Sequence, residues 1–119
     1  EKAKAHAGDV DFEVQPELLS LLSNRDFGRY ADEKGEMNVC FISNNDITGG
    51  NSGSAMFNAK GELLGLAFDG NWEAMSSDIL YEPKMQRCIG VDVRYILFMI
   101  EKYGKAGNLI RELKIASGK

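Results

Sequence analysis

The chain has 119 residues, of which 44% are apolar, and its 18 acidic and 14 basic side chains give a formal net charge of −4. This length and composition allow one folding unit with a core. No basic face is available to neutralise a phosphate backbone, so we expect no nucleic-acid partner. The longest apolar run, residues 95–100, is far shorter than the roughly 20 residues that span a bilayer, so we expect no membrane partner.

The chain begins at Glu1 without an initiator Met, and no charged stretch followed by an apolar stretch marks a signal peptide. We therefore expect a piece of a longer protein. Its two cysteines, Cys40 and Cys88, stand outside any CxxC or Cys/His pattern, which predicts neither a metal site nor a redox motif. One disulfide is an open alternative, but free and packed thiols are favoured because free Cys behaves as a small buried hydrophobe.

The N-terminal segment, residues 1–36, predicts one short helix. Weak apolar alternation favours an extended stretch or a short strand over residues 1–15. Pro16 precedes a leucine-rich run, and proline in a first turn predicts a helix that ends near Asn24. The polar residues and glycines that follow, up to residue 36, predict a loop.

Residues 37–93 predict strands around a glycine-rich loop. Aromatic and β-branched residues favour a strand over 37–42. Residues 55–57 and 62–68 flank a four-residue turn and predict a hairpin, whose second strand is mostly apolar and therefore buried. Alternation over 86–93 predicts a further strand.

Residues 94–115 predict a terminal helix, because apolar residues recur there at helical spacing. Gly104 and Gly107 are the positions at which this helix can break. Strands followed by one terminal helix indicate a mainly β domain with a helical appendage.

The loop around Ser52 carries the candidate chemistry. Gly50 and Gly53 flank the serine, and such a loop can expose a hydroxyl and aim backbone N–H groups at one point, as acyl transfer requires. Taken alone, Gly-Asn-Ser-Gly is more often a plain turn. Ser54 stands in the last place of the pattern Gly-x-Ser-x-Gly, which disfavours an α/β-hydrolase. The loop also leads into a strand, whereas a phosphate cradle leads into a helix.

Further motifs favour a peptidase. Residues 44–54, 68–73 and 91–95 together resemble the bacterial periplasmic dipeptidyl peptidases of types 7 and 11, over residues 25–115. The resemblance implies the C-terminal part of a chymotrypsin-like serine peptidase. Residues 37–93 would then supply strands of its C-terminal β-barrel, and the protein would be periplasmic, secreted or at the cell surface.

The resemblance also implies an activity, the release of dipeptides from the N-terminus of peptide substrates, and a set of site residues. Ser52 would be the acylated nucleophile, and the N–H groups of Gly50 and Ser52 would bind the oxyanion. Phe68, Asp69 and Gly70 would form the S1 pocket, which takes P1, the residue whose carbonyl is attacked. Type 11 enzymes, which prefer acidic P1, carry Arg after Phe-Asp, so Gly70 implies a hydrophobic P1. No cofactor and no metal are implied.

The general base is missing from the motif. A serine hydroxyl needs one, normally a His oriented by a carboxylate. The single histidine, His6, lies in the N-terminal segment, and we interpret it as an incidental, solvated residue. In the resembled family the His and Asp come from the N-terminal half, so that half is the expected partner. The 119-residue chain by itself is expected to be inactive.

Two residues near the site have open alternatives. Asp46 is placed to be the acidic base of a trypsin-like pocket, but we favour a role in satisfying N–H groups of its own loop. Trp72 is either a wall of the site or a packing residue. For the whole chain, the alternatives to an enzyme are a non-catalytic binding module with a peptidase-like fold and an unrelated β domain.

Overall fold

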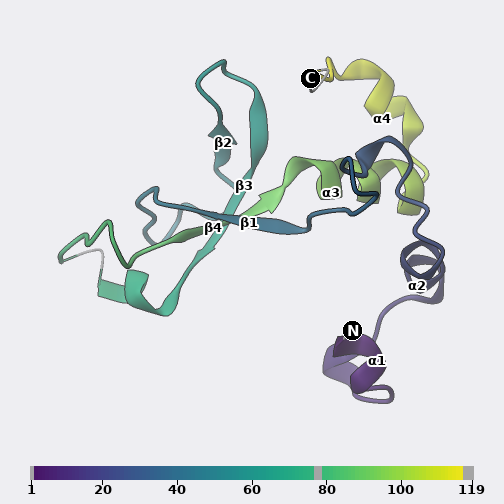
Figure 1. Ribbon diagram of the computed structural model, residues 1–119, viewed down its shortest axis with the longest axis horizontal. Coiled ribbons are helices and arrows are strands. Elements are labelled where there is room, and N and C mark those ends of the chain that lie inside the picture. Colours follow the sequence, from purple (N-terminus) through teal and green to yellow (C-terminus); the bar gives the residue numbers. More distant parts are fainter. Residues whose placement is uncertain (1, 77–78, 117–119) are drawn as a thin grey trace.

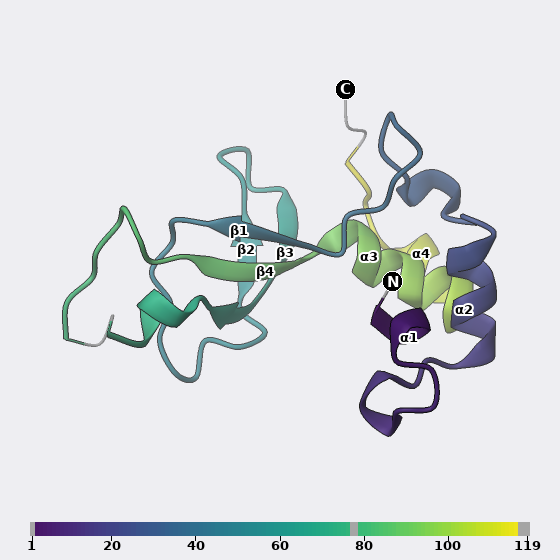
Figure 2. The ribbon, with the colours of Figure 1, turned by 60° about the horizontal axis from the view of Figure 1, so that its bottom comes forward.

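A four-stranded antiparallel sheet forms one end of the molecule in the computed structural model, which describes residues 2–76 and 79–116 (Figures 1 and 2). The strand order is β1-β4-β3-β2. The strands are β1 (Cys40–Ser43), β2 (Ala55–Phe57), β3 (Leu63–Gly70) and β4 (Cys88–Asp92). This arrangement of a sheet with a few helices agrees with the predicted fold class. Within the described residues β1 and β2 are edge strands that do not pair with each other, so the sheet is open and forms no closed barrel.

The predicted hairpin is formed by β2 and β3, but the prediction that its second strand is buried was wrong, because Leu63, Leu64 and Phe68 are exposed. Its turn is closed by Asn58, whose Oδ1 accepts hydrogen bonds from the N–H groups of Lys60 (2.9 Å) and Glu62 (3.0 Å). Further along β3, Ala67 pairs with Gly90 and Asp69 with Ile89, so one extra residue is inserted in β3 between these pairs. Such a bulge bends a strand and redirects its side chains.

The helical end of the molecule contains the predicted helix α2 (Pro16–Ser23), which has proline in its first turn and Asn24 as its cap. The predicted terminal helix is divided into α3 (Val93–Phe98), the π-helical turn η4 (Met99–Tyr103) and α4 (Gly107–Glu112). The break falls at residues 104–106, where Lys105 has a φ of +53°. Gly104 therefore lies at a break, as expected, whereas Gly107 begins a helix.

An aromatic core holds the helical end together. Phe27, Tyr30 and Phe98 are buried, and the rings of Phe27 and Phe98 meet edge to face with centroids 6.1 Å apart. The partly buried apolar side chains packed around them are Leu18, Leu21, Ala31, Met37, Tyr95, Leu97 and Met99. The sequence predicted only a loop for residues 25–36. Within that loop, Phe27 caps the short 3₁₀ turn η2 (Gly28–Tyr30) and Tyr30 ends it, and both of these aromatic rings point into the core.

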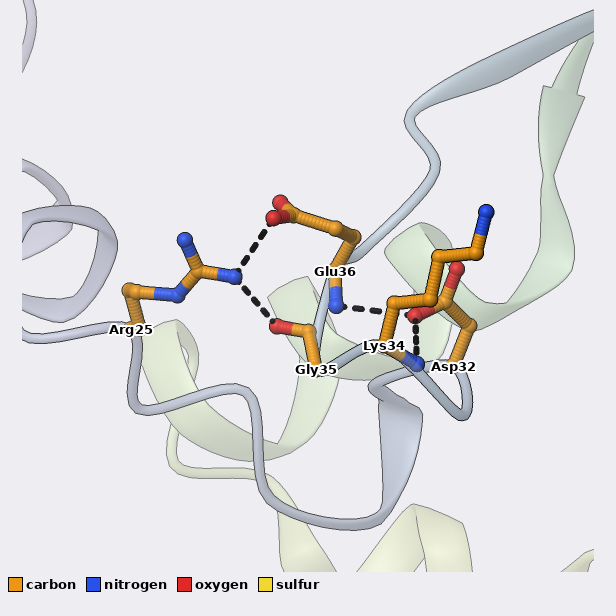
Figure 3. A network of polar contacts seen from close by, with 5 residues as sticks. All are labelled: Arg25, Asp32, Lys34, Gly35 and Glu36. Atoms are coloured by element: carbon orange, nitrogen blue, oxygen red, sulfur yellow. Dashed lines mark hydrogen bonds and ion pairs between the residues drawn. The ribbon is translucent and has the colours of Figure 1, made fainter.

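The rest of this loop is closed by a polar network (Figure 3). Arg25 donates to the Gly35 carbonyl at 2.9 Å and to the Glu36 carboxylate at 2.7 Å. Asp32 accepts from the backbone N–H groups of Lys34 and Glu36, and these bonds, above all the one from Glu36, lower the pKa of Asp32. These hydrogen bonds hold together the two ends of the segment 25–36, which leads from the aromatic core toward β1.

Two predicted strands differ from the structure. Residues 2–15 contain the helical turns α1 (Lys2–Ala5) and η1 (Val10–Phe12) where an extended stretch or a short strand was expected, and residue 1 of that expectation lies outside the described residues. The Asp9 carboxylate accepts the N–H of Asp11 and caps η1. The strand predicted over 37–42 begins only at Cys40, because Met37 is drawn into the aromatic core.

Both cysteines are free, as favoured by the sequence. Cys88 is packed in the sheet, and its burial raises the pKa of its thiol. The expectation of packing was wrong for Cys40, which is exposed on the edge strand β1. No helix within residues 2–76 and 79–116 has the length and apolar character needed to cross a bilayer.

Candidate active site

Ser52 lies in an exposed loop immediately before β2, as predicted. Gly50 and Gly53 have φ values of +92° and +86°, in the left-handed region that glycine adopts without strain. The N–H of Gly53 donates to the Ala67 carbonyl at 2.7 Å, and the N–H of Ala67 donates to the Ser54 carbonyl at 2.8 Å. These two bonds fasten the loop to β3 directly after the serine.

Asn51 closes the other side of the loop. Its Oδ1 accepts the N–H of Thr48 at 3.0 Å, and its own N–H donates to the Thr48 carbonyl at 3.2 Å. The N–H groups of Gly50 and Ser52, in contrast, donate to no acceptor in the described part of the chain. Backbone N–H groups without an acceptor are the kind of donor that an oxyanion hole uses.

The Ser52 hydroxyl donates to the Phe68 carbonyl at 3.5 Å, a long and weak contact. Phe68 is the inserted residue of the β3 bulge. The bulge therefore turns this carbonyl toward the serine loop. His6 is occupied elsewhere, because its ring stacks on Phe12 with centroids 4.5 Å apart, in a segment that Figures 1 and 2 show at the helical end of the molecule.

A pocket of about 240 Å³ opens beside Ser52. Phe68, Asp69 and Gly70, the three residues assigned to S1 from the sequence, all line it together with Ser52. The other lining residues, which sequence reasoning did not identify, are Ile47, Thr48, Gly49, Asn71, Ala74 and Met75. Several of them belong to the 3₁₀ turn η3 (Trp72–Ser76) or its approach, a segment for which the sequence predicted only a polar loop.

The pocket wall combines polar and apolar residues and is tightly packed around Gly70. A Cβ atom on Gly70 would lie 2.8 Å from the Cβ of Ala74 and 3.5 Å from Cγ2 of Ile47. Gly70 therefore gives the wall room to approach β3. No Lys or Arg is among the residues that line the pocket within the described chain, and the Asp69 carboxylate accepts the N–H of Gly70 at 2.8 Å.

The structure assigns neither proposed role to Asp46 or Trp72. Asp46 is exposed and does not line the pocket, and within the described chain its carboxylate accepts no hydrogen bond from its own loop. Trp72 is 81% exposed, so it does not pack inside this chain, and it is absent from the pocket lining.

The sequence profile of the peptidase S46 family matches residues 1–115. The chain belongs to the peptidase S46 family. It is 60% identical over 108 residues to dipeptidyl-peptidase 7 of Porphyromonas endodontalis, an alignment that covers 91% of this chain and 13% of that protein. It is 51% identical, again over 108 residues, to the Asp/Glu-specific dipeptidyl-peptidase of Capnocytophaga gingivalis, with 91% of this chain and 15% of that protein covered.

The folds agree as well. The crystal structure of Porphyromonas endodontalis DPP11 in complex with substrate matches with a TM-score of 0.87 and 42% sequence identity, over 93% of this chain and 16% of that one. The structure of the same protein with the dipeptide Arg-Glu matches with a TM-score of 0.84 and 45% identity, over 88% and 15% of the two chains. The chain thus spans about one-seventh of the length of these relatives.

Proposed function

We propose that this chain is the nucleophile-bearing part of a serine-type dipeptidyl peptidase of the S46 family. The observation that carries the proposal is the placement of Ser52: it lines a pocket, on a loop where the N–H groups of Gly50 and Ser52 have no acceptor among the described residues. The names of the relatives as dipeptidyl peptidases support the same reaction.

In the proposed reaction, Ser52 Oγ attacks the carbonyl carbon of P1, the second residue of the substrate. A base takes the hydroxyl proton and returns it to the leaving amine, while the N–H groups of Gly50 and Ser52 stabilise the oxyanion. The product amine leaves with the rest of the peptide. Water then attacks the acyl-enzyme and releases the dipeptide, and Ser52 recovers its proton.

The base and its orienting carboxylate are proposed to come from the remaining N-terminal half of the protein. That half would also complete the open sheet into the C-terminal barrel of a chymotrypsin-like fold. Exposed apolar side chains on the sheet and its loops, such as Ile42 and Phe57, are suited to such an interface. The resemblance alone supports a periplasmic or cell-surface location.

We propose a hydrophobic P1 residue for this peptidase. Phe68, Ala74 and Met75 contribute apolar side chains to the pocket, and no cation lines it within the described residues. Among the described residues Asp69 is the only charged one in the lining, and it would repel an acidic P1 side chain. The related enzymes carry both kinds of name, since some are dipeptidyl-peptidase 7 and others are Asp/Glu-specific.

The test compares Ser52→Ala with Ser54→Ala in the full-length protein. Both serines belong to the same loop, so Ser54→Ala is the matched control. Hydrolysis of a dipeptidyl substrate with Leu at P1 is expected to fall at least about 10³-fold in Ser52→Ala and to stay within about tenfold in Ser54→Ala. The isolated 119-residue chain is expected to show no turnover. Peptide binding without hydrolysis by the full-length protein would instead support a non-catalytic module.

A further inference from the structure

Asn71 connects the end of β3 to two other segments. Its N–H donates to the Arg87 carbonyl at 3.0 Å, and its Oδ1 accepts the N–H of Arg87 at 2.8 Å. Its Nδ2 donates to the Glu73 carboxylate at 2.6 Å and to the Met85 carbonyl at 2.9 Å. One side chain therefore ties β3 to the beginning of η3 and to the approach to β4.

These bonds fix the position of the pocket wall. The Asn71 carbonyl accepts the N–H of Ala74 at 2.9 Å, which makes the turn that brings the Ala74 methyl against Gly70. Ala74 is buried, whereas the next residue, Met75, is 73% exposed at the edge of the pocket. At the other end of this turn the Ser76 hydroxyl accepts from Gln86 Nε2 at 3.2 Å. The hydrogen bonds of Asn71 fix the beginning of the turn, the end that lies against Gly70.

We propose that Asn71 is a positioning residue that sets the depth of the S1 pocket and so its preference for the size of P1. It acts through the backbone of η3 and the Ala74 methyl, and its amide groups are used within the protein. The proposal rests on the proposed function, because it assumes that the pocket beside Ser52 receives P1.

The experiment uses Asn71→Asp in the full-length peptidase. The substitution keeps the acceptor for Arg87 but replaces both Nδ2 donors with an oxygen that faces the Glu73 carboxylate. The measured quantity is the ratio of kcat/KM for Leu at P1 to kcat/KM for Ala at P1. We expect this ratio to change about tenfold, mainly through KM for the Leu substrate.

Asn58→Asp is the matched control. Asn58 also donates through Nδ2 to a glutamate, Glu62, at 2.6 Å and accepts backbone N–H groups through Oδ1, but it lies in the β2–β3 turn and not in the pocket lining. The control is expected to leave the Leu-to-Ala ratio unchanged. Adding Glu73→Gln to Asn71→Asp restores a hydrogen-bond donor between positions 71 and 73. The Leu-to-Ala ratio of kcat/KM should then return part of the way to its wild-type value.

Two outcomes separate the possible failures. If Asn71→Asp lowers kcat/KM equally for both substrates, the positioning role is wrong while Ser52 chemistry stands. If hydrolysis persists in Ser52→Ala, the proposed function itself is wrong. Should Asn71→Asp fail to fold, Glu73→Ala removes one acceptor of the Asn71 amide and is expected to shift the ratio about threefold; an unchanged ratio would then overturn the proposal.

Discussion

In the helical region, aromatic side chains from separate segments pack against one another, whereas in the sheet region side chains of similar size lie exposed. Phe98 is fully buried between α2 and η2, but Phe57 on β2 is 61% exposed. The chain is also less compact than an independent domain, with a radius of gyration of 16.4 Å against about 13.5 Å expected for its length. The candidate site belongs to the sheet region, where this chain does not cover its own apolar surface.

The largest expected effect on stability comes from removing one aromatic ring, in the helical region or in the sheet region. Phe98→Ala empties the centre of the aromatic core and should lower the free energy of unfolding by about 3–5 kcal/mol. Phe57→Ala removes a ring that solvent already reaches and should cost less than about 1 kcal/mol in the isolated chain. Urea denaturation of the 119-residue chain, followed by circular dichroism, compares the two. Equal losses would show that the sheet region has a core of its own.

A second prediction concerns the pocket on the sheet beside Ser52. Gly70→Arg in the full-length protein would offer an acidic P1 a charge-assisted hydrogen bond, so the ratio of kcat/KM for Asp to that for Leu should rise about tenfold or more. The Ala74 methyl obstructs the new side chain, since a Cβ at position 70 would lie 2.8 Å away. Ala74→Gly added to Gly70→Arg should therefore increase the change. A wild-type preference for Lys at P1 would contradict the assignment of this pocket.

A smaller effect is expected from pH in the helical region. Glu101 accepts hydrogen bonds from the Tyr30 hydroxyl and from Arg29, and these lower the pKa of Glu101. Because the folded pKa lies below the ordinary value of about 4.3, the stabilisation is present above that pH and is lost as the pH falls through the folded pKa. In Glu101→Gln the melting temperature of the helical region should depend less on pH below about pH 5. Glu112→Gln is the control, and an equal flattening in both variants would count against the Tyr30–Glu101 contact.

The same contact acts in the opposite sense at alkaline pH. Burial, and then the hydrogen bond to Glu101, raise the pKa of Tyr30. A raised pKa means that the folded state favours the neutral phenol of Tyr30. The contribution of Tyr30 to the free energy of unfolding is therefore complete below about pH 10 and is lost as the pH rises through the folded pKa. Tyr30→Phe should remove this alkaline dependence, which a pH series of melting temperatures would measure.

Local patterns predicted the elements that local chemistry determines. Pro16 set the start of α2, and the apolar runs around the Asn58 turn set the β2–β3 hairpin. The serine loop was found because glycines at 50 and 53 permit positive φ values. The resemblance to a family located Phe68, Asp69 and Gly70, and the structure brings these residues together in one pocket with Ser52.

The features that were missed depend on contacts distant in the sequence. Tyr30 was assigned to a loop, because nothing in its polar neighbourhood indicates that Phe98 will pack beside it. The wall residue Ala74 was missed because its place follows from the bonds between Asn71 and residues 85–87. Within the described residues the edge strands β1 and β2 do not pair, so closing the sheet into a barrel would need strands from elsewhere in the protein. The closed barrel therefore stays a proposal.

The site of a covalent adduct tests the role of Ser52 most directly. The full-length peptidase would be inactivated with an organophosphonate that reacts with activated serines, digested, and analysed by mass spectrometry. We predict one stoichiometric adduct on Ser52, formed in parallel with the loss of activity and absent from the isolated 119-residue chain, because the base is proposed to come from the rest of the protein. Complete inactivation with Ser52 unmodified, or with the adduct on Ser54, would show that Ser52 is not the nucleophile.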